Sequence, residues 1–152
     1  MSRDVSRLFA LRLSPPDLIN YCLVNKETLE NICNSREFWI QKLSIDYPEV
    51  LLPFLKYNLK LQNPKNTYIR KFTEMSKKLE EIANREEIPY DKLYKVYEEL
   101  LKNRILVGEY SYEGYKEIYN KYNVGRFDEL EMLVSNRIKQ LEDAEEAMSL
   151  MK

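Results

Sequence analysis

The chain of 152 residues contains no histidine and only two cysteines. Histidine is the commonest general base and the commonest metal ligand, so its absence removes the usual starting point for both kinds of site. Cys22 and Cys33 are too few for a tetrahedral zinc site without imidazole ligands. Neither thiol has an activating group beside it in the sequence, so a cysteine nucleophile is not expected either. The sequence therefore predicts a protein that is not an enzyme and that binds no metal or cofactor.

Glycine and proline are also scarce, with 3 and 6 residues respectively. Turn-rich β-proteins usually need more of both. No stretch alternates apolar and polar residues for long, and no Asn-Gly or Asp-Gly pair offers a hairpin turn. The three glycines are too scattered to cradle a phosphate. We therefore expect an all-α protein.

Long apolar runs are missing as well. No window approaches the roughly 20 apolar residues that span a bilayer, and the N-terminus lacks the unbroken apolar stretch of a signal peptide. These absences favour a cytoplasmic or nuclear protein with no membrane partner. In such a compartment we expect Cys22 and Cys33 to be reduced and to act as small buried hydrophobic residues.

The net charge of −1 hides an uneven distribution. Residues 1–78 contain 13 basic and 8 acidic side chains, whereas residues 79–152 contain 11 and 17, giving +5 and −6. A nucleic-acid-binding chain would instead cluster its basic residues on one face and have a high pI. The distribution fits two ordinary solvated surfaces, or a basic half that meets an acidic partner. Nucleic acid is not an expected partner.

The spacing of apolar residues, interrupted by proline and by Asn or Ser, predicts a series of helices. Between residues 50 and 61, Pro53 limits the chain to short helical turns. Asn34 is expected to cap the helix that follows it, and Gly108 to end the helix before it. The predicted helices cover residues 4–13, 16–24, 26–33, 35–46, 64–84, 90–106, 110–122 and 127–150.

The charged segment at residues 77–87 predicts either a boundary between subdomains or part of one long exposed helix. A division into residues 1–47, 48–88 and 89–152 follows from the first interpretation. The last predicted helix presents an apolar stripe from Phe127 to Met148 that something must cover. Residues 91–106 of the same chain, or a second copy pairing as a coiled coil in a homodimer, are the two alternatives.

Tyrosine is abundant, with 12 residues, and eight of these lie between Tyr90 and Tyr122. A stripe of aromatic residues at helical spacing forms either the buried face of a helix or a binding surface. Tyrosine suits binding surfaces because it offers a large contact area with few rotatable bonds and a polar tip. The candidates for a surface that binds a protein partner are Tyr110, Tyr112, Tyr115, Tyr119 and Tyr122.

The first third of the chain carries a pair of apolar residues, Leu8 and Phe9, followed by a proline-containing turn at residues 13–18 (Leu-Ser-Pro-Pro-Asp-Leu). These features resemble the paired apolar residues of the first helix of an F-box and the start of its second helix. Residues 23–26 (Leu-Val-Asn-Lys) resemble the end of that helix. Closing positions of the motif are matched by Ile32, Phe38, Trp39 and Leu43.

The resemblance covers about residues 5–43, and a looser similarity continues through residues 46–48 and 63–72. The longer pattern is similar to F-box-like proteins of large DNA viruses. Two positions depart from it, since Arg3-Asp4 replaces the usual Leu-Pro opening and Thr28 replaces the usual tryptophan. No propeller or leucine-rich repeat follows, so residues 89–152 are expected to form a separate helical module.

The resemblance implies a substrate receptor of a cullin-based ubiquitin ligase. Its F-box-like module would bind the small adaptor subunit, while the Tyr-rich module would hold an unidentified protein cargo. A viral chain of this kind would act in the host cytoplasm or nucleus. One alternative is a viral structural or assembly protein that keeps the fold without the ligase role, and another is a helical nucleic-acid-binding protein. The implied adaptor-binding residues are Leu8, Phe9, Leu13, Leu18, Val24 and Trp39.

Overall fold

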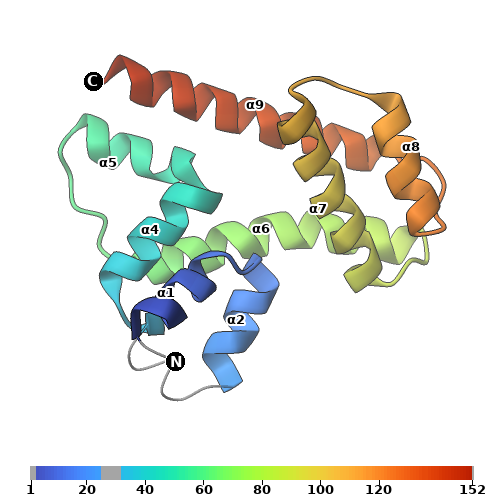
Figure 1. The fold of residues 1–152 in the computed structure, drawn as a ribbon. Coiled ribbons are helices and arrows are strands. Elements are labelled where there is room, and N and C mark those ends of the chain that lie inside the picture. Colours follow the sequence, from blue (N-terminus) through green and yellow to red (C-terminus); the bar gives the residue numbers. More distant parts are fainter. Residues whose placement is uncertain (1–2, 25–31, 152) are drawn as a thin grey trace. The chain divides into compact units, whose positions relative to one another are not determined.

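The computed structural model describes residues 3–24 and 32–151 (Figure 1). Within these ranges the regular structure is helical and no strand occurs, so the expectation of an all-α fold is confirmed. Contacts divide the chain into two compact units. The first unit comprises Met1–Thr73 and Ala147–Lys152, and the second comprises Glu74–Glu146. These limits differ from the three-part division expected from sequence, because the helix at residues 64–85 contributes to both units.

The first unit begins with α1 and α2, and Pro15 occupies the first position of α2, where its missing N–H costs no hydrogen bond. Ser35, rather than the expected Asn34, caps α4, because its side-chain oxygen accepts a hydrogen bond from the backbone N–H of Phe38. The elements are α1 (Arg3–Leu11), α2 (Pro15–Val24), α4 (Arg36–Asp46), the 3₁₀ helix η2 (Pro48–Leu51), α5 (Leu52–Lys56) and the start of α6 (Pro64–Arg85).

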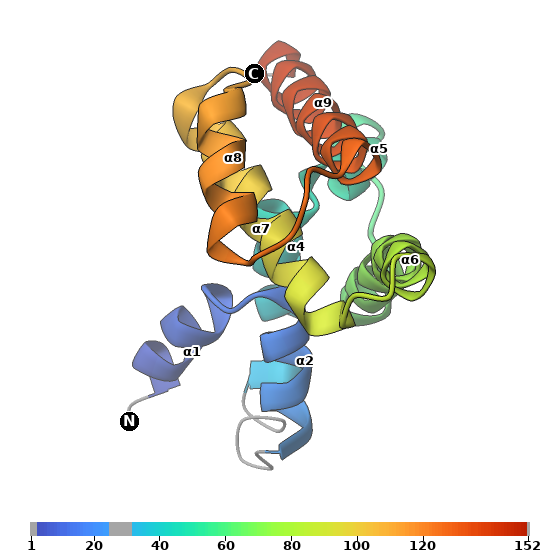
Figure 2. The same cartoon turned by 90° about the vertical axis from the view of Figure 1, so that its right-hand side faces the viewer.

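The second unit contains the rest of α6, followed by α7 (Tyr90–Val107), α8 (Tyr112–Lys121) and α9 (Asp128–Leu150), which extends into the first unit. Gly108 ends α7 with a φ of 81°, a left-handed conformation that glycine adopts without steric cost. Ser111 caps α8 through the N–H of Gly114. The helices α7 and α8 lie side by side (Figure 2).

The helix boundaries agree with the sequence-based expectations to within about two residues, apart from one segment. The helix expected at residues 26–33 lies almost entirely outside the described residues. The segment at residues 77–87 does not interrupt α6, which continues to Arg85.

Each unit has its own buried core. In the first unit the core is aromatic, and the ring of Trp39 lies 5.2 Å from those of both Phe38 and Tyr68. In the second unit the expected stripe on α9 is buried within the chain at Leu130, Val134 and Ile138. This part of the stripe is therefore covered without a second copy.

Candidate protein-binding surfaces

The six residues expected to bind an adaptor do not form one exposed face. Leu8 and Phe9 project from α1 with 57% and 48% of their surface exposed. Leu13 is half-buried, and Leu18 and Trp39 are buried in the core. The side chain of Val24 lies outside the described part of the structure. Of the described residues in that set, only Leu8, Phe9 and the half-buried Leu13 remain accessible, on α1 and just after its C-terminal end.

Trp39 is a core residue and not an exposed anchor, which corrects the sequence-based expectation. Its ring is 2% exposed, and its Nε1–H donates a hydrogen bond of 2.6 Å to the carbonyl oxygen of Cys33. Leu18 is likewise fully buried, at 0% exposure. The ring of Tyr68 from α6 packs on the indole of Trp39, and this contact helps to enclose Trp39 in the core.

A buried lysine fixes the end of α1. Lys42 of α4 is 1% exposed, and its Nζ donates to the carbonyl oxygens of Leu11 and Leu13 at 2.9 Å and 2.5 Å. It also forms an ion pair of 3.0 Å with Asp46, which accepts a hydrogen bond from Tyr68. A cation is favourable at this end of a helix, where carbonyl groups lack intrahelical donors. Lys42 therefore holds α1 against α4 while the opposite side of α1 stays exposed.

Cys22 and Cys33 form a disulfide bond, so the expectation of two reduced thiols is wrong. Their Cα atoms lie 5.9 Å apart, within the normal range for a disulfide. Both residues are buried, as expected. Spacing alone did not predict the pair because it is the packing of α2 beside the start of α4 that brings the two residues together.

The Tyr-rich segment combines core and surface residues. Tyr115 and Tyr119 were expected to contact a partner, but they are only 1% and 3% exposed and are therefore core residues. Tyr110 and Tyr112 remain exposed at 45% and 43%, and Tyr122 is half-buried. Tyr112, Tyr115 and Tyr119 do lie on one helix, as their spacing predicted. However, Tyr115 and Tyr119 lie on its inner face.

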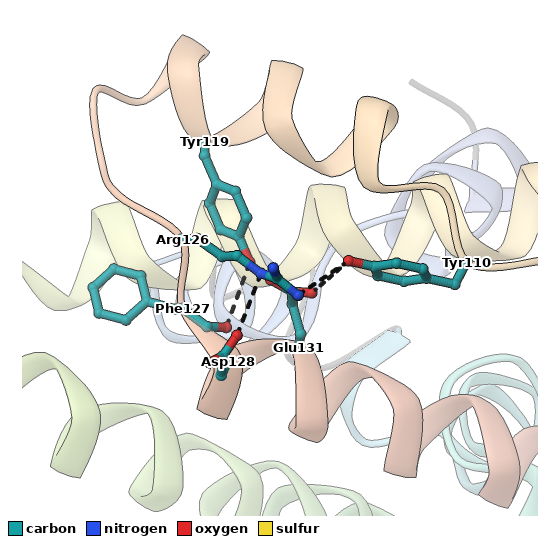
Figure 3. Close-up of polar contacts among 6 residues, drawn as sticks. All are labelled: Tyr110, Tyr119, Arg126, Phe127, Asp128 and Glu131. Carbon is teal, nitrogen blue, oxygen red and sulfur yellow. Dashed lines mark hydrogen bonds and ion pairs between the residues drawn. The ribbon is translucent and has the colours of Figure 1, made fainter.

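Glu131 is the centre of a polar cluster that positions Tyr110 and Tyr119 (Figure 3). This carboxylate of α9 is 8% exposed, and it accepts hydrogen bonds from Tyr119 at 2.7 Å and from Tyr110 at 3.1 Å. Arg126 donates to it through Nε at 3.1 Å. Burial, and then the bond to Glu131, raise the pKa of the Tyr119 hydroxyl above its usual value.

Such a cluster stabilises the fold and fixes Tyr110 at the surface. The guanidinium of Arg126 also lies over the ring of Tyr112, with Cζ 5.0 Å from the ring centroid, a cation–π contact. The pKa of Arg126 is raised, chiefly by its hydrogen bond to Glu131. The two exposed tyrosines are therefore held in place before any partner arrives.

Sequence reasoning missed an aliphatic patch beside these tyrosines. Ile105, Leu106 and Val107, at the end of α7, are 55%, 86% and 49% exposed. Together with Tyr110 and Tyr112 they form what we call the α7–α8 corner. The sequence does contain a pattern that indicates this patch, namely three successive aliphatic residues directly before the glycine that ends the helix. Three successive residues point in different directions around a helix, so they cannot all face the core.

In the part of the chain that the structure describes, no group of three or more potential metal-ligating side chains comes together. Among the described helices, none combines the length and the hydropathy that crossing a bilayer requires. Comparisons with protein-family models, with curated proteins and with solved structures each find no match.

Proposed function

We propose that the chain is a non-enzymatic protein-binding protein, an F-box-like receptor that recruits a cargo protein to a cullin-based ubiquitin ligase through the small adaptor subunit. The observation that carries this proposal is the exposure of Leu8 and Phe9 on α1, at 57% and 48%. Two adjacent large apolar side chains on a firmly held helix are typical of a docking surface.

The anchoring of α1 supports a preformed docking helix. Lys42 fixes its C-terminal end, and Arg7 on α1 donates two hydrogen bonds to Gln41 of α4, at 2.7 Å and 3.1 Å. A partner that binds such a helix does not have to order it first, so less free energy is lost on binding. The basic character of the first half of the chain would speed association with an acidic adaptor.

The α7–α8 corner is the proposed cargo surface. It combines two exposed tyrosines with three exposed aliphatic residues, a composition enriched in the centres of protein interfaces. Because Tyr115 and Tyr119 belong to the core, Tyr112 and Leu106 are the better positions for a binding test. Tyr112→Ala and Leu106→Ser should weaken cargo capture while the melting temperature changes little.

Adaptor capture from host extract tests the ligase role. The full chain should retain a cullin adaptor, and the double variant Leu8→Ser, Phe9→Ser should lose it while keeping its helicity, although loss of the Phe9–Tyr21 ring contact should lower its melting temperature slightly. Leu106→Ser is the matched control, because it also removes an exposed leucine but lies in the other unit. It should retain the adaptor in full.

The alternative is a viral structural or assembly protein with the same helical plan. It is favoured by the departures from the F-box pattern at Arg3-Asp4 and Thr28. A folded wild-type chain that captures no adaptor at physiological salt would leave this alternative as the better account.

A further inference from the structure

A projecting turn after α5 carries an unusual set of side chains. Residues 55–60 read Leu-Lys-Tyr-Asn-Leu-Lys, and every one of them is exposed. Leu55, Tyr57 and Leu59 are 58%, 64% and 59% exposed, while Lys56 and Lys60 alternate with them. Six successive exposed residues indicate a turn whose side chains face solvent. This α5 tip belongs to neither of the surfaces assigned above.

The backbone of the α5 tip is held in one conformation. Asn58 adopts a left-handed conformation with φ of 53°, and the N–H of Leu59 donates to the carbonyl oxygen of Phe54 at 2.8 Å. The N–H of Asn58 lies 3.5 Å from the carbonyl oxygen of Leu55. This pattern is the Schellman motif, which closes the C-terminus of a helix. The apolar side chains are therefore presented by a fixed turn.

The segment of sequence that contains the α5 tip carries charge of one sign. Residues 50–73 contain no aspartate or glutamate and five basic residues, Lys56, Lys60, Lys65, Arg70 and Lys71, of which Lys71 forms an ion pair with Glu49. The first unit as a whole has 12 basic and 7 acidic residues, a net charge of +5. Lys56 lies 5.5 Å from the centroid of the Tyr57 ring, which places one cation at the tip itself. A negatively charged surface is the complement.

We propose that the α5 tip binds the surface of a bilayer that contains anionic phospholipid. Leucine side chains gain by leaving water for the acyl boundary, and tyrosine favours the level of the headgroups. Lysines bury their methylene stems and keep their ammonium groups among the lipid phosphates. A fully exposed turn can contact a flat lipid surface, whereas an acidic peptide would need a groove to order it.

This inference does not depend on the proposed receptor function, and it revises one expectation. The sequence predicted no membrane partner because it has no bilayer-spanning stretch. Surface binding needs no such stretch, since two or three inserted side chains and a few basic residues supply the attraction.

The test is co-sedimentation of the full chain with two kinds of vesicle, phosphatidylcholine alone and phosphatidylcholine with about one-fifth phosphatidylserine. The chain should bind the anionic vesicles, and binding should weaken as salt is raised, because the lysine contribution is screened. Leu55→Ser with Leu59→Ser should reduce the partition constant at least about tenfold. Lys56→Gln with Lys60→Gln should reduce it by about the same factor.

The matched control is Met132→Ser with Lys139→Gln, which changes an exposed apolar residue and an exposed lysine on α9. It should bind anionic vesicles as the wild type does, and all three double variants should keep the wild-type melting temperature. No binding to anionic vesicles would overturn the proposal. Binding that both tip variants retain, or that the control loses equally, would overturn it as well.

Discussion

Tyr97 illustrates how single buried groups shape the chemistry of this protein. Its side chain is 3% exposed, and its hydroxyl donates to the sulfur of Met75 at 3.3 Å. Burial raises the pKa of Tyr97 to about 12 from the usual value of 10, against a small opposing effect of Arg137. Ionisation of this phenol is thus harder in the folded chain than in the unfolded chain.

The sign of the pH dependence follows from that difference. Between pH 10 and 12 the unfolded chain has lost the Tyr97 proton and the folded chain keeps it, so stability falls as pH rises. The free energy of unfolding should therefore fall by about 2–3 kcal/mol less in Tyr97→Phe than in the wild type over this pH range, as measured by urea unfolding. Tyr57→Phe, at a side chain 64% exposed, is the control and should leave the slope unchanged. An unaltered slope in Tyr97→Phe would contradict the burial argument.

At this scale the sequence was informative about composition and less so about which side chains are buried. It predicted the tyrosine stripe, but Tyr115 and Tyr119 face the core and Tyr112 faces solvent. It did not predict that Glu131 would be buried, because a single carboxylate on an amphipathic helix is normally solvated. Its donors come from three other segments, namely the connection before α8 (Tyr110), α8 itself (Tyr119) and the connection before α9 (Arg126), and the fold brings them together.

The C-terminal end of α1 is held by a side chain from α4, Lys42. Lys42→Met should destabilise the protein by about 2–4 kcal/mol, because Asp46 loses a buried partner and two carbonyl groups lose their donor. Chemical denaturation of the variant measures this effect. Lys102→Met is the control, since its ion pair with Glu98 is exposed and should change stability by less than about 1 kcal/mol. Equal effects at the two positions would contradict the anchoring role.

The disulfide makes a second prediction for the same unit. The bond joins two residues that are 11 apart in the sequence. Closing a loop of this length lowers the conformational entropy of the unfolded chain and so stabilises the folded chain by about 3 kcal/mol. Reduction should lower the stability of the wild type by that amount and leave Cys22→Ala with Cys33→Ala unaffected. Protein purified without reductant and unfolded in guanidinium should show no reactive thiol. Two titratable thiols in that assay would contradict the bond.

The elements themselves were largely predictable because their boundaries are encoded locally. Proline at the starts of α2 and α6 and Gly108 after α7 act through backbone conformation alone. The cap of α4 was misplaced by one residue, since Asn34 and Ser35 are both good capping residues. The disulfide and the limits of the two units depend on contacts between distant segments, which apolar spacing does not encode.

For the molecule as a whole, the buried stripe on α9 predicts a monomer. Leu130, Val134 and Ile138 are already buried within the chain, so a coiled-coil seam has little apolar area left to bury there. Sedimentation equilibrium at micromolar concentration should return a single mass of 18.3 kDa. Ile138→Asp should destabilise the chain by several kcal/mol because it buries a charge without a partner. A concentration-dependent dimer would show that another face of the chain self-associates.

The measurement that tests the central claim most directly is a calorimetric titration of the full chain with a purified cullin adaptor. The account predicts saturable one-to-one binding that the double variant Leu8→Ser, Phe9→Ser abolishes while its helicity matches that of the wild type. Binding should also show a negative heat-capacity change, because the exposed apolar surface of α1 leaves water. The absence of heat at any adaptor concentration, or binding that survives the double variant, would contradict the receptor function.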